Sequence, residues 1–384
     1  MKIKPVKIKH VEAIAVSLPM KRPVFMAGVE IRSADNVLVR IEADNGVVGW
    51  GEAASAPTMT GETVESMMAA IGYLAPAVEE RPAEDIAGTV AVMGKRMYAN
   101  NAAKAAIEIA LHDLVGRATG RPAYALLGAR QRGRMPLLGV IGTGELASDL
   151  REAERKKAQG YAAFKIKVGI DTPLIDAERT RRICALIGRG ALISSDANQG
   201  WSTHEAVQYV RAVADAGLTF FEQPVAADDI AGMATVADAA EAAGNIAIGA
   251  DESIHSPEDL RRMHERRAAR GVSLKTIKLG GMRGVMAAGH LCQELGLNVN
   301  VAAKTGESSI ACAAAVHVAA VLPQLAWGLT LSNEGLAEDV TASPIVIERG
   351  HLEISDAPGL GVEVDEERVR RHRRDVAKSA RRVA

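Results

Sequence analysis

Between about residue 135 and residue 335, short apolar runs alternate with amphipathic segments, and this alternation restricts the possible folds more than any other feature. Segments 177–186 and 204–216 have helical spacing and contain neither proline nor glycine. Eight such units predict an α/β fold, a (β/α)8 TIM-type barrel, with its active site at the C-terminal ends of the strands. A doubly wound sheet is the alternative, but no G-x-G-x-x-G motif follows a strand. The candidate strands are residues 136–141, 163–168, 191–196, 218–222, 246–251, 273–277, 298–303 and 326–331.

The N-terminal third has a different pattern. Residues 9–55 read as antiparallel strands, with a strong hairpin signal at Asp44-Asn45-Gly46. Helical periodicity follows in residues 63–77, 83–97 and 102–119, and Gly120 is placed to end the last of these helices. The pattern predicts a separate α+β domain ahead of the barrel.

Charge and cysteine content exclude several classes of protein. With 46 basic and 47 acidic residues the formal charge is −1, which argues against nucleic acid or an anionic membrane as the main partner. No apolar stretch approaches the roughly 20 residues that span a bilayer, and residues 1–5 are not followed by the apolar core of a secretory signal. Cys184, Cys292 and Cys312 are expected to be buried, reduced thiols. We therefore expect a cytoplasmic protein with a small-molecule partner.

Three acidic residues each end an apolar run: Asp196, Glu222 and Asp251. Spacings of 26 and 29 residues match one strand and helix unit each. Neighbouring strands lie about 5 Å apart, so the three strand ends can converge on one ion. Oxygen ligands suit Mg²⁺ or Mn²⁺, which complete their shell with water and a substrate carboxylate. Helix N-caps or loop charges are the alternative, and three carboxylates in phase make metal binding the preferred interpretation.

Lysines flank these carboxylates at similar spacing. Strand alternation puts Lys165 and Lys167 on one face, which points inward in a barrel strand, whereas an edge strand would leave both solvated. Downstream, Lys275 begins the sixth candidate strand and Lys278 follows it. Their odd separation means that both cannot easily face the interior, and the pattern leaves open which one does.

A metal ion and lysines together suit proton transfer next to a carboxylate. The ion would stabilise the enediolate that forms while a lysine takes the α-proton. The lysine acts as a base only if its pKa is lowered, which the charges of the metal and of neighbouring lysines favour. Lysines on opposite sides of the barrel would address both faces of one carbon, which permits racemisation, or a stereospecific addition or elimination.

The chain resembles the enolase superfamily, and within it the muconate lactonizing enzyme (muconate cycloisomerase) subgroup of the mandelate racemase/muconate lactonizing enzyme family. The resemblance covers nearly the whole chain, and residues 45–52 and 105–128 are similar to the family's N-terminal capping domain. The motifs that carry it are Lys165-Ile166-Lys167, Asp196-Ala197-Asn198-Gln199-Gly200-Trp201, Glu222-Gln223-Pro224, Ala250-Asp251-Glu252-Ser253, residues 275–281 and Glu307-Ser308-Ser309-Ile310.

This resemblance implies a role for each matching residue. Lys167 and Lys275 would be the bases on opposite faces, and the spacing to the paired glycines favours Lys275 over Lys278. Lys165 would neutralise substrate charge and depress the neighbouring pKa, and Glu307 would orient the site. The Mg²⁺ ligands would be Asp196, Glu222 and Asp251. The resemblance also implies three segments: an N-terminal capping domain of residues 1–132, a barrel of residues 133–355, and a C-terminal segment of residues 356–384 that returns to the cap.

Several departures bear on the reaction. Strand seven carries no histidine, which disfavours the mandelate racemase subgroup, and His317 is expected to be a packed helix residue. The eighth strand end lacks the Asp-x-Asp of dipeptide epimerases, although residues 56–63 look similar to those enzymes. Lys304 stands where the cycloisomerase pattern is apolar. It would either bind a second substrate carboxylate or form a salt bridge with Glu307, and the sequence favours neither.

Substrate choice is expected to depend on the cap, through residues 20–26, a segment linking the first two strands, and residues 55–60. Arg22 with Lys304 would suit a dicarboxylate. The candidate substrate-binding residues are Arg22, Pro57, Asn198 and Lys304.

The first functional hypothesis is a Mg²⁺-dependent isomerase of the muconate cycloisomerase type, in which Lys167 protonates the enolate. The second is a racemase or epimerase of N-substituted amino acids or dipeptides, with Lys167 and Lys275 as a two-base pair. The third is a lyase, either a dehydratase or an o-succinylbenzoate synthase. The family likeness also suggests a homo-oligomer.

Overall fold

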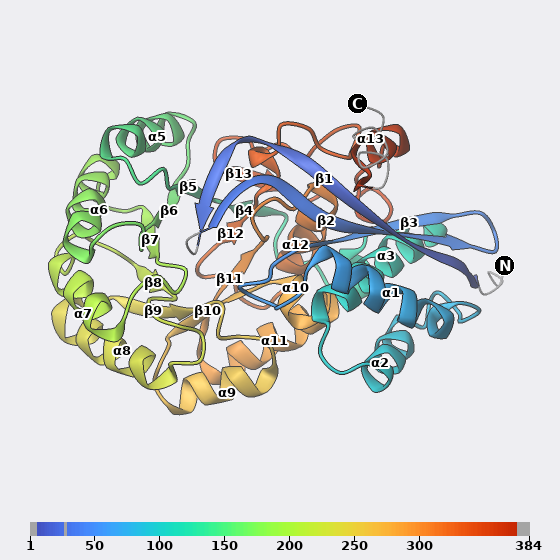
Figure 1. Cartoon of the computed structure of the whole chain (residues 1–384), viewed down its shortest axis with the longest axis horizontal. Coiled ribbons are helices and arrows are strands. Elements are labelled where there is room, and N and C mark those ends of the chain that lie inside the picture. Colours follow the sequence, from blue (N-terminus) through green and yellow to red (C-terminus); the bar gives the residue numbers. More distant parts are fainter. Residues whose placement is uncertain (1–5, 27–28, 375–384) are drawn as a thin grey trace.

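The computed structural model describes residues 6–26 and 29–374, so the signal-peptide argument about residues 1–5 concerns residues outside the described part. An N-terminal α+β domain, called the cap below, lies against a parallel barrel (Figure 1). The predicted fold class is therefore confirmed. The cap elements are β1 (Ile8–Met26), β2 (Val29–Ala43), β3 (Val48–Ala54), α1 (Val64–Val78), α2 (Ile86–Arg96) and α3 (Asn101–Thr119), followed by the short helix α4 (Tyr124–Leu127).

The barrel is one eight-stranded sheet in the order β12-β11-β10-β9-β8-β7-β6-β5, with parallel pairing throughout. Its strands are β5 (Leu138–Ile141), β6 (Ala163–Lys167), β7 (Leu192–Asp196), β8 (Phe220–Glu222), β9 (Ala247–Ala250), β10 (Gly271–Leu274), β11 (Asn298–Ala302) and β12 (Leu329–Thr330). The intervening helices are α5 (Leu146–Ala158), α6 (Pro173–Ile187), α7 (Thr203–Ala212), α8 (Ile230–Gly244), α9 (Pro257–Glu265), α10 (Thr276–Leu279), α11 (Met282–Leu295) and α12 (Ser309–Val321).

The barrel differs from the predicted (β/α)8 pattern at its last unit. A single parallel bridge between Leu137 and Leu329 joins the two ends of the sheet. In the described chain β12 leads into the one-turn 3-10 helix η1 (Asn333–Gly335) rather than into an eighth barrel helix. The seam between β5 and β12 therefore has a helix, α5, on one side only.

The cap sheet packs very closely on α3. β1, β2 and β3 pair antiparallel, and the predicted turn at Asp44-Asn45-Gly46 joins the last two strands, with Gly46 at a φ of 83°. A Cβ atom on Gly51 would lie 2.0 Å from the carbonyl oxygen of Ala106, so only glycine permits this approach. Ile277 of α10 belongs to the same apolar core, so barrel residues next to Lys275 are packed against the cap.

Residues 20–26 are part of a strand and not the linking loop expected from sequence. They lie in the C-terminal part of β1, where the register with β2 shifts between Pro19 and Val24. The β1–β2 ribbon extends from the cap across the barrel (Figure 1). β1 continues through these residues because β2 is long enough to pair with them.

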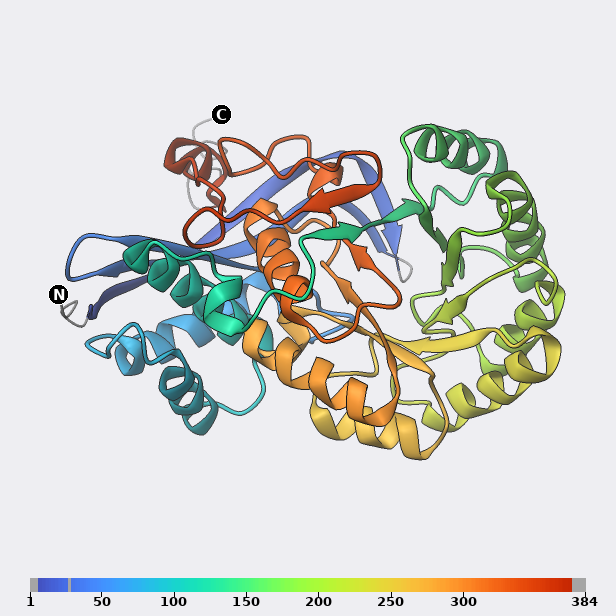
Figure 2. The ribbon, with the colours of Figure 1, turned by 180° about the vertical axis from the view of Figure 1, so that it is seen from behind.

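The C-terminal part of the described chain, up to residue 374, runs back along the cap, and residues 375–384 of the predicted segment lie outside the described residues. β13 (His351–Glu353) pairs with β4 (Arg134–Pro136), and α13 (Glu366–His372) lies beside β1 (Figure 2). Isolated bridges join Leu336 to Met20 and Arg373 to Val16. These contacts tie β1 to both later segments.

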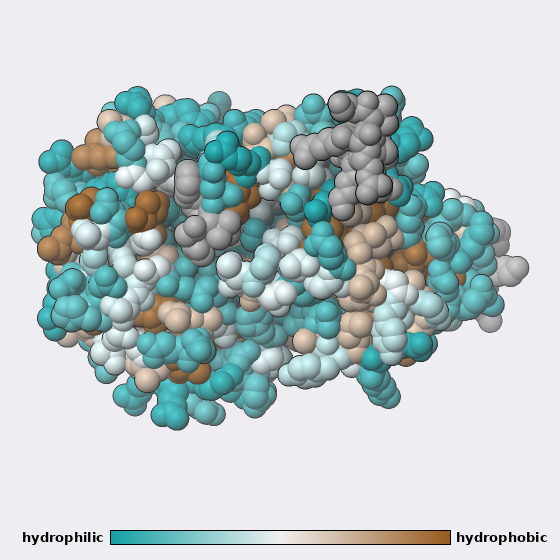
Figure 3. Space-filling model, viewed as in Figure 1, coloured by the Kyte–Doolittle hydropathy of each residue, from teal (hydrophilic) through white to brown (hydrophobic). Residues whose placement is uncertain are grey.

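The surface in Figure 3 is largely hydrophilic, with hydrophobic residues in small scattered groups. Within the described residues, no helix is long and apolar enough to cross a membrane. The three cysteines lie buried and unbridged in helices α6, α11 and α12, as expected.

Candidate functional site

A cavity of about 700 Å³ lies at the C-terminal ends of the barrel strands, where the cap covers them. The cap contributes a stretch of β1 and Met59, and the barrel contributes most of the residues that the sequence singled out. The candidate residues that line it are Arg22, Lys165, Lys167, Asp196, Asn198, Asp251, Lys275 and Lys304.

The pairing register of β6, β7 and β8 places one lysine and two of the three carboxylates directly beside one another at the strand ends. Lys167 of β6 pairs with Asp196 of β7, which pairs with Glu222 of β8. The ammonium of Lys167 donates to Asp196 Oδ2 at 2.6 Å and to Asn198 Oδ1 at 2.7 Å. Lys165, two residues earlier on the same face, donates to Glu222 Oε2 at 2.5 Å. The predicted inward orientation of the two lysines therefore holds.

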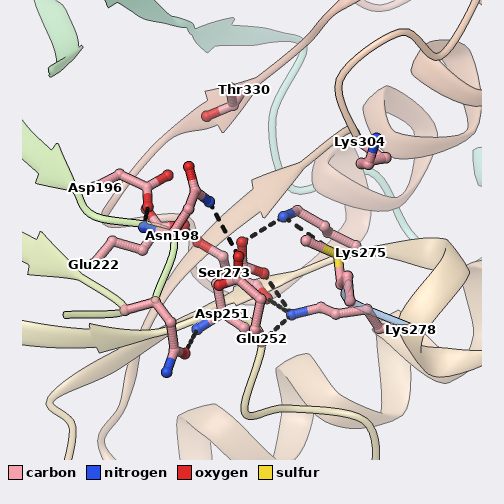
Figure 4. Close-up of polar contacts among 12 residues, drawn as sticks. Asp196, Asn198, Glu222, Asp251, Glu252, Ser273, Lys275, Lys278, Lys304 and Thr330 are labelled. Carbon is pink, nitrogen blue, oxygen red and sulfur yellow. Dashed lines mark hydrogen bonds and ion pairs between the residues drawn. The ribbon is translucent and has the colours of Figure 1, made fainter. Parts of the chain in front are cut away.

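Lys275 and Lys278 both reach Asp251 (Figure 4). Lys278 is fully buried, and its Nζ donates to Asp251 Oδ1 at 2.6 Å and to the Ser273 carbonyl at 2.9 Å. The expectation that both cannot face the interior was wrong, as was the extent of the sixth strand. β10 ends at Leu274 and a helical turn begins at Thr276, so strand alternation does not apply across the pair. Lys275 thus follows the strand, at its C-terminal end.

The charges at the site shift one another's pKa. Burial raises the pKa of Glu222, whereas Lys167 and Lys165 outweigh burial and lower the pKa of Asp196. Lys275 was expected to have a lowered pKa beside a metal ion. Here burial lowers its pKa, but the charge of Asp251 outweighs burial and raises it overall. Burial lowers the pKa of Lys278.

The donor set of the three carboxylates fits a hard divalent cation. Asp196, Glu222 and Asp251 are each at most 1% exposed, and burial together with the negative charges of Asp196 and Asp251 raises the pKa of Glu222. Such a cluster needs cations as partners, and lysine ammonium groups supply them in this structure. Within residues 6–26 and 29–374, no three acidic, histidine or cysteine side chains are arranged around one point. Three buried oxygen donors at neighbouring strand ends are nevertheless the chemistry that Mg²⁺ prefers.

Lys304 and Glu307 are both buried but do not pair through their charged groups. The backbone N–H of Lys304 donates to Glu307 Oε2 at 3.0 Å, while its ammonium donates to the Thr305 carbonyl at 3.2 Å. Burial lowers the pKa of Lys304 to about 8. Burial and then the charge of Glu52 raise the pKa of Glu307 to about 8. Lys304 lies apart from the Asp251 cluster in Figure 4, and it lines the cavity.

The remaining candidates differ in position. Arg22 lines the cavity from β1 and is exposed. Asn198 bridges Lys167 and Glu252, donating to Glu252 Oε1 at 3.1 Å. Pro57 is exposed and is not among the residues that line the cavity; Met59, from the same segment, lies with its sulfur 3.8 Å from Lys275 Nζ.

Sequence reasoning gave no role to three further polar residues. Glu252 is buried, and burial and the charge of Asp251 raise its pKa to about 7. Its position directly after a candidate ligand was the available signal. Ser273 donates to Glu222 Oε1 at 2.9 Å. Glu52 of β3 accepts from Ser308 at the start of α12, a long-range contact that no local pattern marks.

Family models match most of the chain. The model of the mandelate racemase/muconate lactonizing enzyme N-terminal domain matches residues 9–128. The enolase C-terminal domain-like model matches residues 148–368.

Individual proteins match over nearly their full length. A chloromuconate cycloisomerase from Cupriavidus necator is 31% identical, over 96% of this chain and 99% of its own. An L-Ala-D/L-Glu epimerase from Clostridium acetobutylicum is 32% identical, over 94% of this chain and 99% of its own length. The crystal structure of a muconate lactonizing enzyme from Pseudomonas fluorescens, complexed with muconolactone, has a TM-score of 0.90 at 30% identity, covering 97% of this chain and 100% of that one.

Proposed function

Because this chain belongs to the mandelate racemase/muconate lactonizing enzyme family and is an isomerase of the enolase superfamily, we propose that it moves a proton at the carbon next to a substrate carboxylate. One observation carries the proposal. Lys167 and Lys275 line the same cavity from β6 and from the end of β10, which are four strands apart in the eight-stranded barrel and therefore opposite each other.

We assign the divalent cation to Asp196, Glu222 and Asp251. A bound Mg²⁺, or Mn²⁺, would supply positive charge where the substrate carboxylate gains negative charge during the reaction. Ser273 holds Glu222 by a hydrogen bond to Oε1, and Lys278 holds Asp251 through both its carboxylate and its carbonyl oxygen. These contacts hold both acidic side chains in place; Asp251 lines the cavity, and Glu222 lies behind the lining residues.

The lysines carry the proton. Lys167 presents its Nζ on one side of the cavity and Lys275 presents its Nζ on the other, so one takes or gives a proton on each face of the substrate carbon. Lys165 lies between the carboxylates and neutralises charge, with its Nζ 2.5 Å from Glu222 Oε2 and 3.9 Å from Asp196 Oδ2. Glu307 orients Lys304 through its backbone.

The first reaction to test is cycloisomerisation of a muconate. The similarity to chloromuconate and muconate enzymes supports it. In this reaction Lys167 delivers a proton to the enolate formed by ring closure. Lys304 and Arg22 would bind the second carboxylate of the diacid, because both line the cavity with cationic groups.

Epimerisation of an N-substituted amino acid or dipeptide is the second candidate. Two opposed lysines support it, since inversion of a carbon needs a proton donor and acceptor on opposite faces. The volume of about 700 Å³ supports it as well, because cavities of that size hold ligands larger than a six-carbon diacid.

Deuterium exchange distinguishes the two reactions. In D₂O with Mg²⁺, an epimerase acting on L-Ala-L-Glu incorporates deuterium at the α-carbon of substrate and product alike. A cycloisomerase acting on cis,cis-muconate forms one lactone and returns unlabelled substrate. Absence of turnover and of exchange with every carboxylic acid offered, in folded protein loaded with Mg²⁺, would refute the proposal.

Lys167→Ala tests the role of the base. The variant should lose roughly 10²- to 10⁴-fold in kcat, which is the contribution of proton transfer by a positioned side chain. Lys157→Ala, on the exposed side of α5, is the matched control and should keep full activity. Activity retained in Lys167→Ala would remove this residue from the mechanism.

A further inference from the structure

The substrate cavity extends beyond Lys165 and Lys167 toward helix α5. Its lining includes Glu152 and Lys156 of α5, Tyr161 just before β6, and Glu334 of η1. These residues lie outside the barrel, along the seam between β5 and β12. The two edge strands of this seam are joined by a single bridge only. Among the described residues, the short helix η1 takes the place of the eighth helix that would cover the seam. The seam is therefore open.

Lys156 occupies this extension with unfilled hydrogen-bonding capacity. It is only 7% exposed, and its aliphatic stem lies against β5, where a Cβ atom on Gly139 would come within 2.7 Å of its Cδ. Its Nζ lies 4.8 Å from the centre of the Tyr161 ring. The nearest carboxylate oxygen, Glu152 Oε1, is 3.7 Å away, beyond hydrogen-bond distance.

Glu152 is already engaged by another cation. Arg155 donates to both of its oxygens, at 2.6 and 3.0 Å. Within the described chain, Lys156 therefore shares Glu152 with Arg155 as the longer of two ion pairs, and no hydrogen bond of normal length from its ammonium is formed. A closer acceptor that enters the cavity would complete a charge-assisted hydrogen bond to this ammonium and would be bound favourably.

The charge of the extension favours an anion. Arg22, Arg155 and Lys156 outnumber the two carboxylates of Glu152 and Glu334 by one positive charge. Burial and then the charge of Glu334 raise the pKa of Tyr161, so this hydroxyl stays protonated and adds no negative charge to the extension.

The position of Lys156 sets the length of the ligand. A Cβ atom on Gly142 would lie 2.7 Å from Lys167 Cβ and Cγ, and one on Gly139, three residues earlier, would lie 2.7 Å from Lys156 Cδ on the other face of the strand. Three residues of strand span roughly 10 Å. The carboxylate carbons of a six-carbon diacid are separated by only about 6 Å, given carbon–carbon bonds of about 1.5 Å.

We propose that Lys156 binds a second anionic group of the substrate, roughly 10 Å along β5 from Lys167, so that the enzyme selects elongated diacids over six-carbon ones. This inference rests on the proposed proton-transfer function and favours its longer-substrate form. The shorter diacid would reach Lys304 instead. The lining of the seam, and not the cap alone, would then determine specificity.

The test measures binding of inert acids by titration calorimetry in the presence of Mg²⁺. Adipate is the short diacid, sebacate the long one, and decanoate has the length of sebacate without its distal carboxylate. Wild type should bind sebacate at least tenfold more tightly than either of the others. Lys156→Met, which keeps the packing on β5, should bind sebacate no more tightly than decanoate and leave adipate unchanged.

Lys157→Met is the matched control, because Lys157 is exposed and donates to the Leu186 carbonyl. It should bind all three acids as wild type does. A Lys156→Gln variant provides a second test if the methionine variant does not fold.

Equal affinity of wild type for sebacate and adipate would overturn the inference, as would an unchanged sebacate affinity in a folded Lys156 variant. A failure of the proposed function would give a different result. In that case the preference for the longer acid and its dependence on Lys156 would remain, but no acid would be turned over or exchange its α-proton.

Discussion

Lys304 is a buried cation whose charge can change near neutral pH. It is 6% exposed, and burial lowers the pKa of its ammonium to about 8. Its only described hydrogen bond from Nζ goes to a neighbouring carbonyl, so a substrate carboxylate could add to it without displacing an ion pair. These features favour the substrate-binding alternative over a salt bridge with Glu307.

We predict that KM rises above about pH 8, because Lys304 loses its proton and hence its attraction for a carboxylate. Lys304→Met should raise KM roughly 10- to 100-fold, since a hydrogen bond to a charged group contributes about 1.5–3 kcal/mol. Its KM should no longer vary around pH 8. Steady-state kinetics between pH 6.5 and 9 check this, and an unchanged KM profile in the variant would contradict it.

His317 is a buried imidazole whose burial disfavours the charged form. It is buried in α12, accepts from the Tyr124 N–H at 3.2 Å and lies 3.0 Å from the Leu360 carbonyl. Burial lowers its pKa from 6.5 to about 4. The packing role expected from sequence therefore fits its contacts.

This lowered pKa predicts a loss of stability in acid. The unfolded chain takes up a proton near pH 6.5 and the folded chain only near pH 4, so the stabilisation is complete above pH 6.5 and is lost as pH falls toward 4. About 2 kcal/mol should be lost between pH 7.5 and pH 5. Urea unfolding of His317→Gln should show a smaller pH dependence than wild type. The exposed His290→Gln is the control, and an equal dependence in all three proteins would exclude this role.

At the scale of elements, Glu52 connects the cap sheet to a barrel helix. It is fully buried in β3, and its oxygens accept from the Ser308 N–H at 2.9 Å, the Ala311 N–H at 3.1 Å and Asn36 Nδ2 at 2.6 Å. It therefore satisfies free N–H groups at the start of α12 from another domain. The loop before α12 carries Lys304 and Glu307. The contact between Glu52 and the start of α12 therefore also fixes the edge of the site.

Glu52→Ala should lower the free energy of unfolding by at least about 3 kcal/mol, because several buried donors lose their acceptor at about 1–3 kcal/mol each. Glu145→Ala removes an exposed carboxylate that caps α5 by the same type of bond. This control should cost only about 1 kcal/mol. Urea unfolding compares the two, and similar losses would show that Glu52 has no special role.

At the scale of the whole molecule, the proposed cation site predicts that activity and stability both depend on a divalent ion. We predict that a chelator abolishes turnover and that added Mg²⁺ restores it. Binding to the folded state alone should also raise the unfolding free energy, by about 2.7 kcal/mol at a hundred times Kd. Thermal unfolding with and without Mg²⁺ measures this. Full activity after exhaustive chelation would contradict the metal assignment.

The sequence by itself determined the barrel, the cap and the strand ends that carry charge. Asp196, Glu222 and Lys167 could be placed together because strand periodicity is local and parallel strands end at one edge. The helices of the cap were also within reach, since their apolar spacing and the glycine at position 120 are local signals.

Only the tertiary structure decided the features that depend on contacts between distant segments. Lys278 joined Lys275 at Asp251 because a helical turn packed against the cap starts right after β10. Pairing with β2 places residues 20–26, which the sequence pattern indicated to be a loop, in strand β1. The open seam beside Lys156 exists because the chain after β12 bridges back to the cap at Met20 and, up to residue 374, forms no barrel helix there. Such pairings depend on which surfaces meet in the folded molecule, and no periodicity along the chain encodes them.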